Sequence, residues 1–598
     1  MRYKFYGNRI QYDNKSTNHF IFSLKQGFGF VIEENRLLLE ELQSPELNSG
    51  FEPYYWQKGE KLTHLSPSSN GMTLQNGEHI PLIFKAMVPT PGRYHLTVTI
   101  TAGDSEIHNL TVSINRRQLI GHLSLLRAGA TWVIHTSVNL CPIIPRGKTL
   151  PEDVTSIDLS IIADCPVVSE LEIHECNVPT LFLMGDSTVT DQGASYPNVP
   201  GNNYCGWGQM LRTFLSPDIA VSNHAHSGLT TESFRTEGHY DIIKKHIHPG
   251  DFCMFQFGHN DQKLSHLSAK GGYTEQLKQY TNELKELGAL PILVSPIARN
   301  TWKRNGQYND LLIDYAQVCE EIAAELGIPF VNLHKKSMDF IQLIGLEQTQ
   351  RYFFPNDYTH TNDYGGYMMG SLVAMELEKI PFLANHIDHS AFSEEWPPPQ
   401  TLVIPTPPKD FSIDSTELRE VSFTDISASS HKDAIISLTQ KGIISNEATI
   451  FDCDRALTRI EAMDWLVKTV RFVPTNVYND HFSDVLGHEW YAGLVEVVWQ
   501  NDILPPALTV DGLFHPQAPV TEGEFLSFCI NSFACRKSLP DIALSDFDLT
   551  HFDSQKSWMN RDLTYARALG LTDESMNPDT IITRAVAVGY LFVLAQLL

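Results

Sequence analysis

Between residues 179 and 385, short apolar runs alternate with longer amphipathic stretches. The apolar runs have the length of buried strands, and the two clearest amphipathic stretches end in glycine, a frequent helix-stop signal. The apolar runs read TLFLMG, IAVSNHA, DFCMFQFG, LPILVSPI and IPFVNLH, and the amphipathic stretches read TEQLKQYTNELKELG and LIDYAQVCEEIAAELG. This alternation predicts an α/β domain over 179–385, with a parallel sheet and helices on both of its faces.

The chain on either side of this region follows other patterns, and 598 residues are too many for a single core. Residues 1–178 contain alternating runs such as YHLTVTI, NLTVSIN and SIDLSII, separated by turn residues, which predicts a β-sandwich. This sandwich is either a packing partner or a surface that contacts carbohydrate. Residues 386–415 contain EEWPPPQTLVIPTPPKD, which predicts an extended, semi-rigid proline-rich linker.

Residues 416–598 repeat one pattern three times. FTD, FSD and a weaker FDS each precede a helical stretch, and the motifs ALTRIEA, PVTEGEF and IITRAVA follow. The threonines of these second motifs, Thr458, Thr521 and Thr583, stand 63 and 62 residues apart. The pattern predicts an α-helical triple repeat.

Charge and cysteine usage limit what the chain can bind. With 44 basic and 70 acidic residues, the net charge is −26, which disfavours nucleic acid and anionic membranes as partners. No apolar run is long enough to cross a membrane, and the first residues lack a secretory signal, so the chain as written is expected in the cytoplasm. The nine cysteines are scattered without zinc-ligand spacing, so we interpret them as small buried hydrophobes and expect no dependence on disulfides.

Four polar motifs fall inside the α/β region, and three of them follow predicted strands. They are Gly185-Asp186-Ser187, NHAHSGLTTESF with Gly228, FQFGHNDQK with Asn260, and FPNDYTHTNDYGG with Asp357 and His360. Doubly wound sheets gather the carboxyl ends of their strands along one edge. We therefore expect these residues to meet in one crevice.

The residue types in these motifs suit acyl transfer. Ser187 is the candidate nucleophile, His360 the base that accepts its proton, and Asp357 the carboxylate that orients the imidazole. Candidate donors to the oxyanion are the backbone N–H groups of Ser187 and Gly228 and the side-chain amide of Asn260. Glycine at 228 leaves no Cβ to obstruct a ligand.

Each of these residues also has an ordinary structural interpretation. Ser187 or Thr188 is a possible helix cap after a central strand, and Asn260 is another. Asp357 fits an Asx-turn, and His360 is one of 24 histidines. His224 and His226 have the spacing of a metal pair but no accompanying carboxylate cluster, so we expect a structural or pocket role for them and neither metal nor cofactor in this chain.

The motifs together resemble the consecutive blocks of the SGNH (GDSL) hydrolases, and within them the rhamnogalacturonan acetylesterases of the twelfth carbohydrate esterase family. The resemblance is carried by LFLMGDSTVTDQ, GWGQML, NHAHSGLTTESF, GDFCMFQFGHNDQK and DYTHTNDYGG. It implies a flavodoxin-like parallel sheet and the same roles for the residues assigned above. Further predicted substrate contacts are Asp186, Trp207 and His259.

The flanking regions resemble other domains. QGFGF and FKAMVPTPGRYHLTVTI resemble a galactose-binding-like β-sandwich. Residues 416–598 resemble S-layer homology repeats, with Thr458-Arg459 and Thr583-Arg584 but Thr521-Glu522 in the second unit. This resemblance implies a cell-wall polymer as partner and a cell-surface location, with packing on the enzyme or formation of a homodimer as alternatives.

The predicted function is a metal-independent serine esterase that removes acetyl groups from plant cell-wall polysaccharide or oligosaccharide, pectic rhamnogalacturonan first. Many rhamnogalacturonan acetylesterases have Gly-Arg-Ser-Ser where this chain has Gly228-Leu229-Thr230-Thr231. Acetylated xylan or mannan therefore stays an alternative substrate. A carbohydrate- or wall-binding protein with an inactive esterase fold is the alternative from another class.

Overall fold

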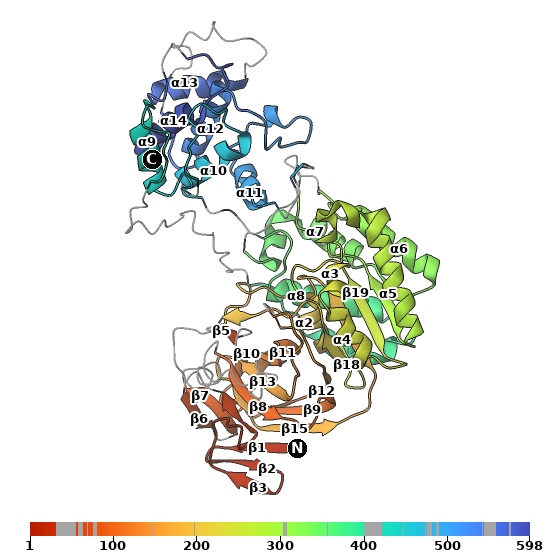
Figure 1. Cartoon of the computed structure of the whole chain (residues 1–598). Helices are drawn as coiled ribbons and strands as arrows, with labels where there is room; N and C mark the ends of the chain where they lie inside the picture. Colours follow the sequence, from red (N-terminus) through yellow and green to blue (C-terminus); the bar gives the residue numbers. More distant parts are fainter. Residues whose placement is uncertain are drawn as a thin grey trace. The chain divides into compact units, whose positions relative to one another are not determined.

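The chain forms two compact units, Met1–Pro405 and Thr406–Leu598 (Figure 1). The structure is a computed structural model. It describes residues 1–31, 56–57, 64–68, 70–75, 80–145, 148–195, 198–302, 308–355, 357–399, 421–446, 448–472, 474, 481–482, 484–485, 489–540, 542, 558–572 and 576–598.

The centre of the first unit is a run of five parallel strands. In spatial order they are β21 (Phe330–Val331), β20 (Leu290–Val294), β19 (Phe252–Gln256), β16 (Thr180–Gly185) and β18 (Ala220–Asn223). Every neighbouring pair among them is parallel. Counted along the chain, the order is 2-1-3-4-5, the flavodoxin-like arrangement whose ligand site lies beyond the strand ends at the reversal point.

Helices cover both faces of these parallel strands, as the alternation of strand and helix in the sequence predicts (Figure 1). In β16, Leu181 and Leu183 belong to one apolar cluster, and Phe182 and Met184 belong to the cluster on the opposite face. The first cluster contains side chains of α2 (Trp207–Leu211), α7 (Leu333–Thr349) and α8 (Asp363–Leu377), and the second contains side chains of α3 (Ser233–Thr236), α4 (His239–His246), α5 (Thr274–Glu286) and α6 (Ile313–Leu326).

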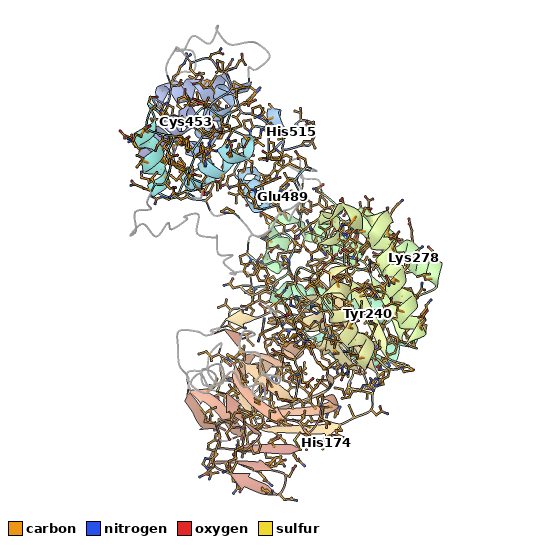
Figure 2. The ribbon with its side chains drawn as sticks, in the orientation of Figure 1. His174, Tyr240, Lys278, Cys453, Glu489 and His515 are labelled. Atoms are coloured by element: carbon orange, nitrogen blue, oxygen red, sulfur yellow. The ribbon has the colours of Figure 1, made fainter. Side chains whose placement is uncertain are left out.

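Figure 2 shows the side chains on these elements. Tyr240 of α4 is buried among the helices. Lys278 of α5 lies on the surface and pairs with Glu325 of α6 at 2.7 Å. The two predicted amphipathic stretches therefore pack side by side, with their polar sides turned to solvent.

The parallel strands continue without a break into strands of residues 1–178. β12 (Thr131–Leu140) pairs with β18 in parallel through Val138 and Val221. Beyond it the strands are antiparallel, in the order β9 (Gly92–Thr101), β15 (Glu170–Glu175), β1 (Arg2–Tyr6), β2 (Arg9–Tyr12) and β3 (Lys15–Thr17). The result is one mixed sheet of eleven strands.

A second, antiparallel sheet lies against this extension. Its order is β11 (Gln118–Leu126), β10 (Ile107–Ile114), β13 (Ser156–Ile162), β8 (Leu82–Met87) and β4 (Phe28–Val31). Apolar side chains of both sheets, among them Leu96, Leu159 and Phe84, form one hydrophobic cluster. The remaining short strands are β14 (Val167–Val168), β7 (Gly71–Gln75), β6 (His64–Ser68), β17 (Ala194–Ser195) and β5 (Trp56–Gln57). The galactose-binding type of sandwich and a boundary at 178/179 stay predictions, although a shared sheet crosses that boundary.

The start of the predicted linker is packed on the first unit. Trp396 stacks on His122 of β11 with ring centroids 4.3 Å apart, and the Tyr367 hydroxyl donates to the Glu394 carbonyl at 2.8 Å. These contacts hold the residues up to 396 against the fold. Residues 400–415 lie outside the described residues, so an extended tether over that stretch stays a prediction.

The second unit contains helices α9 (Lys432–Gln440), α10 (Arg459–Thr469), α11 (Ala492–Gln500), α12 (Glu522–Ala534), α13 (Asn560–Ala568) and α14 (Arg584–Leu597). Thr458, Thr521 and Thr583 are the N-caps of α10, α12 and α14, and each accepts a hydrogen bond from a backbone N–H of the first turn. Isolated bridges join Ala456 to Thr583, Thr458 to Pro519 and Thr521 to Ile581. The FDS motif lies outside the described residues, and the assignment to S-layer homology repeats stays a prediction.

Within the described residues, none of the helices is long and apolar enough to cross a membrane. No group of three acidic, histidine or cysteine side chains among these residues could hold a metal ion. All nine cysteines are free thiols. Five of them are buried, Cys141, Cys205, Cys253, Cys319 and Cys529.

Candidate active site

Ser187 lies in a tight turn at the carboxyl end of β16. The Asp186 carboxylate fixes this turn, because its Oδ1 accepts hydrogen bonds from the Thr188 N–H at 2.9 Å and the Thr188 hydroxyl at 2.7 Å. A Cβ on Gly185 would lie 2.6 Å from a Val189 methyl group, so only glycine fits there. Residues 187–190 do not cap a helix, since the next described helix is α2.

The turn brings Ser187 to the histidine of the fourth motif. Ser187 Oγ lies 2.8 Å from His360 Nε2, and His360 Nδ1 lies 2.7 Å from Asp357 Oδ2. A carboxylate only accepts, so Nδ1 carries the proton and the Nε2 lone pair faces the serine hydroxyl. This is the tautomer that a general base requires.

Asp357 remains charged although only 2% of its surface is exposed. Burial raises the pKa of this carboxyl, but the charge and hydrogen bond of His360 and the N–H groups of Thr359 and His360 hold its pKa below the ordinary value. These N–H groups donate to Oδ1 at 2.7 and 2.8 Å. A carboxylate held in this way stabilises the imidazolium that proton transfer creates.

Aromatic side chains flank the histidine. The half-buried rings of Tyr204 and Phe354 stack with centroids 3.7 Å apart, and Tyr204 meets the His360 ring edge-on at 5.6 Å. The Phe354 N–H also donates to the His360 carbonyl at 2.9 Å. The imidazole is thus held by packing as well as by its hydrogen bonds.

The candidate oxyanion donors follow three adjacent strands, β16, β18 and β19. Among the described residues, neither the Ser187 N–H nor the Gly228 N–H has a hydrogen-bond partner. Gly228 is exposed and has φ +85°, a conformation that favours glycine, and this adds a backbone reason to the steric one. Asn260 Nδ2 donates to the Leu229 carbonyl at 3.0 Å, and its Oδ1 accepts from Lys263 at 3.4 Å. This fixes the amide and leaves its second N–H for another acceptor.

The three predicted substrate contacts lie inside the protein. Asp186, Trp207 and His259 are 0%, 1% and 2% exposed. His259 Nδ1 lies 3.3 Å from Asp186 Oδ2, and His259 Nε2 is 3.0 Å from the Ile297 carbonyl. In this structure they support the turn below Ser187 instead of lining an open surface. Their role in substrate binding stays an untested prediction.

A buried chain of hydrogen bonds connects Trp207 to the same turn. Trp207 Nε1 donates to Gln256 Oε1 at 2.8 Å, and Gln256 Nε2 donates to the Thr188 hydroxyl at 2.6 Å. The Thr188 hydroxyl in turn donates to Asp186. Burial raises the pKa of Asp186, but His259 and Thr188 hold it below the ordinary value, so the chain ends on a carboxylate.

The two histidines of the second motif, His224 and His226, each contact a neighbouring serine residue. His224 is buried and bonded to the Ser222 hydroxyl at 2.9 Å, and burial holds its pKa well below the ordinary value. His226 Nδ1 lies 3.2 Å from the Ser227 carbonyl. No carboxylate or cysteine completes a site with them among the described residues.

Sequence reasoning missed Gln192. Its Nε2 donates to the Ser187 carbonyl at 3.1 Å and to the Ser227 hydroxyl at 3.4 Å, which links the nucleophile's turn to the loop that carries Gly228. The sequence contains one indication, the position of Gln192 as the last residue of the motif LFLMGDSTVTDQ that contains Ser187.

Residues 183–365 match the GDSL-like Lipase/Acylhydrolase family. Rhamnogalacturonan acetylesterase RhgT of Bacillus subtilis is 31% identical over 33% of this chain and 90% of its own length. Probable rhamnogalacturonan acetylesterase YesY of the same organism is 34% identical over 33% of this chain and 93% of its own length.

A solved structure, that of protein YxiM of Bacillus subtilis, matches 60% of this chain and 92% of its own chain at 20% identity. Its TM-score is 0.33. Over its central third, this chain belongs to the GDSL-like lipase/acylhydrolase family, as the matched family range and the identity to the two relatives show.

Proposed function

We propose that this protein is a carbohydrate acetylesterase of the GDSL type, and that it removes O-acetyl groups from acetylated pectin, rhamnogalacturonan first. The observation that carries the proposal is the hydrogen-bonded series Ser187–His360–Asp357, with spacings of 2.8 and 2.7 Å. The names of the relatives RhgT and YesY support the choice of substrate.

The proposed reaction is acyl transfer in two halves. Ser187 Oγ attacks the acetyl carbonyl while its proton passes to His360 Nε2, and the amide donors stabilise the oxyanion. The C–O bond to the sugar then breaks, and the sugar oxygen takes the proton from His360. Water attacks the acetyl-serine with His360 again as base, and acetate leaves as Ser187 recovers its proton.

Two alternatives remain open for the substrate and the activity. Leu229 follows the oxyanion glycine where many rhamnogalacturonan acetylesterases have arginine, so acetylated xylan or mannan is the second substrate class. A protein that binds carbohydrate or cell wall through an inactive esterase fold is the alternative outside enzymes.

The flanking regions extend the proposal. We infer that the galactose-binding-like region contacts carbohydrate and that the C-terminal repeats bind a cell-wall polymer, which would locate the chain at the cell surface. Retention of the purified chain on isolated cell walls tests the second point. The alternative is that the repeats form a homodimer. Analytical ultracentrifugation of the purified chain would detect such a dimer.

The first test of the activity is Ser187→Ala. Hydrolysis of 4-nitrophenyl acetate should fall at least about 10³-fold, because the nucleophile is lost while the rest of the site remains. Ser371→Ala is the matched control, since Ser371 lies within α8 and donates to the Met368 carbonyl. Parental activity in Ser187→Ala would reject the assigned nucleophile.

The second test compares acetate release from acetylated rhamnogalacturonan, xylan and mannan under one set of conditions. Preference for rhamnogalacturonan is the expected result. Preference for another glycan would keep the esterase and replace its substrate, and release from none of them would favour the binding protein.

A further inference from the structure

The loop between β10 and β11 carries two arginines into the α/β part of the first unit. Its residues Asn115 and Arg117 have φ +47° and +58°, a region that residues other than glycine seldom adopt. Arg116 donates to the Asn223 carbonyl and lies 3.1 Å from a carboxylate oxygen of Asp191. Both side chains are largely buried, with 13% of the Arg116 side chain and 6% of the Arg117 side chain exposed.

Arg117 connects two segments that carry catalytic candidates. Its Nη1 donates to the Gln192 carbonyl and its Nη2 donates to Asp363 Oδ1, both at 2.8 Å. Gln192 lies five residues after Ser187, and Asp363 lies three residues after His360. One rigid, planar group thus spans the chain after the nucleophile and the chain after the base.

Both ends of this link are themselves fixed to the site. The Gln192 side chain donates to the Ser187 carbonyl at 3.1 Å, and Gln209 Nε2 donates to the Gln192 carbonyl at 3.0 Å. Asp363 begins helix α8, and its Oδ2 accepts the Gly201 N–H at 3.1 Å. A shift of either segment would therefore shift Ser187 against His360.

We propose that Arg117 is a positioning residue for the Ser187–His360 pair, so that residues 1–178 supply part of the esterase site. The inference rests on the proposed function for its activity readout. Its physical basis is the sensitivity of catalysis to geometry, since a misplacement of about 1 Å can cost about 10²-fold in rate. Lysine cannot replace arginine here, because its ammonium group is a single point charge and lacks two donors in a fixed planar arrangement.

The test compares Arg117→Lys and Arg117→Met in the full chain. We expect kcat for 4-nitrophenyl acetate to fall about 10-fold or more in both, with KM changed less than about threefold, because position is lost and not binding. The rate at which a fluorophosphonate probe labels Ser187 should fall in parallel. Arg117→Lys keeps a cation beside Asp363, so it remains informative if Arg117→Met does not fold.

A double variant separates position from charge. Arg117→Met leaves the buried Asp363 carboxylate without a cation, and adding Asp363→Asn removes that charge. The double variant should recover part of the lost melting temperature and none of the lost kcat. Recovery of kcat together with melting temperature would reduce Arg117 to a structural residue and overturn the inference.

Lys85→Met is the matched control. Lys85 is a fully buried cation of the same β region and pairs with Asp158 at 3.3 Å within the five-stranded sheet. This substitution should lower the melting temperature and leave kcat of the folded protein unchanged.

Parental kcat in both Arg117 variants would refute the positioning role and leave the esterase proposal intact. A parent that hydrolyses no acetyl ester would refute the esterase proposal, and the labelling rates would still decide on Arg117.

Discussion

The Asn260 side chain is oriented by neighbouring residues other than the nucleophile. Its amide is oriented from both ends, by the Leu229 carbonyl and by the Lys263 ammonium group. The carbonyl belongs to the residue after Gly228, so two candidate oxyanion donors are fixed to each other. A preorganised donor of this kind contributes more to a transition state than a free amide does.

At the residue scale we expect Asn260→Ala to lower kcat about 10² to 10³-fold, with KM little changed, because one oxyanion donor is lost. Steady-state kinetics with 4-nitrophenyl acetate measures this. Asn531→Ala is a control that removes an amide of the second unit. Equal kcat in parent and Asn260→Ala would remove Asn260 from the oxyanion site.

The order of motifs in the sequence was enough to propose which side chains meet, because parallel strands end along one edge. It was not enough to tell which way each side chain points. Asp186 adjoins Ser187 in the chain, yet its carboxylate turns inward to Thr188 and His259. Arg117 could not be found at all, since its partners lie 75 and 246 residues away and no pattern connects them.

The segment around Trp396, which follows helix α8 in the chain, is an element for which the sequence predicts only a proline-rich linker. Trp396 covers His122 of β11, and burial lowers the pKa of this histidine to about 4. The folded protein therefore keeps His122 neutral where the unfolded chain binds a proton. Stability contributed by this site is present above the unfolded pKa and is lost as the pH falls toward 4.

At the element scale we expect the melting temperature to fall between pH 7 and pH 5. Protonation of His122 in the unfolded chain should lower the free energy of unfolding by about 2 kcal/mol at pH 5. His122→Phe keeps an aromatic ring under Trp396 and cannot be protonated, so its melting temperature should fall less. Thermal unfolding of both proteins at several pH values measures the difference. Identical pH profiles would show that His122 does not titrate on unfolding.

The starts of helices α10, α12 and α14 in the second unit have a local cause. Thr458 and Thr521 each form a capping box with the glutamate three residues later, and Thr583 caps α14 through its hydroxyl. A cap depends on residues within one turn, so a repeated sequence motif suffices to locate it. The bridges between repeats join residues that are far apart in the sequence, so no local motif predicts them.

At the scale of the whole molecule, the first compact unit includes residues on both sides of position 178. Local alternation does not specify which strands are neighbours, and β12 pairs with β18 of the α/β region on one side and with β9 on the other. Residues before and after position 178 thus share one sheet and one compact unit. Pairing between strands that are distant in sequence depends on tertiary contacts, which the pattern of a single sequence does not reveal.

At this largest scale we expect a chain that ends at residue 405 to keep kcat for 4-nitrophenyl acetate within about twofold of the parent, because all described residues of the candidate site lie in the first unit. Retention on cell walls should be lost if the repeats supply it. A folded but inactive 1–405 chain would show that the second unit takes part in the reaction.

The bent loop with Arg117 also has a consequence for synthesis. The ribosome releases Arg117 well before its partners, which follow 75 and 246 residues later. At about 5 to 20 residues per second, the longer interval lasts roughly 10 to 50 seconds. Until Gln192 is synthesised the guanidinium group has neither of these two partners, and until Asp363 is synthesised it lacks its carboxylate partner. We expect the esterase centre to close last in its unit, at a moment set by translation of the segment that ends in Asp363.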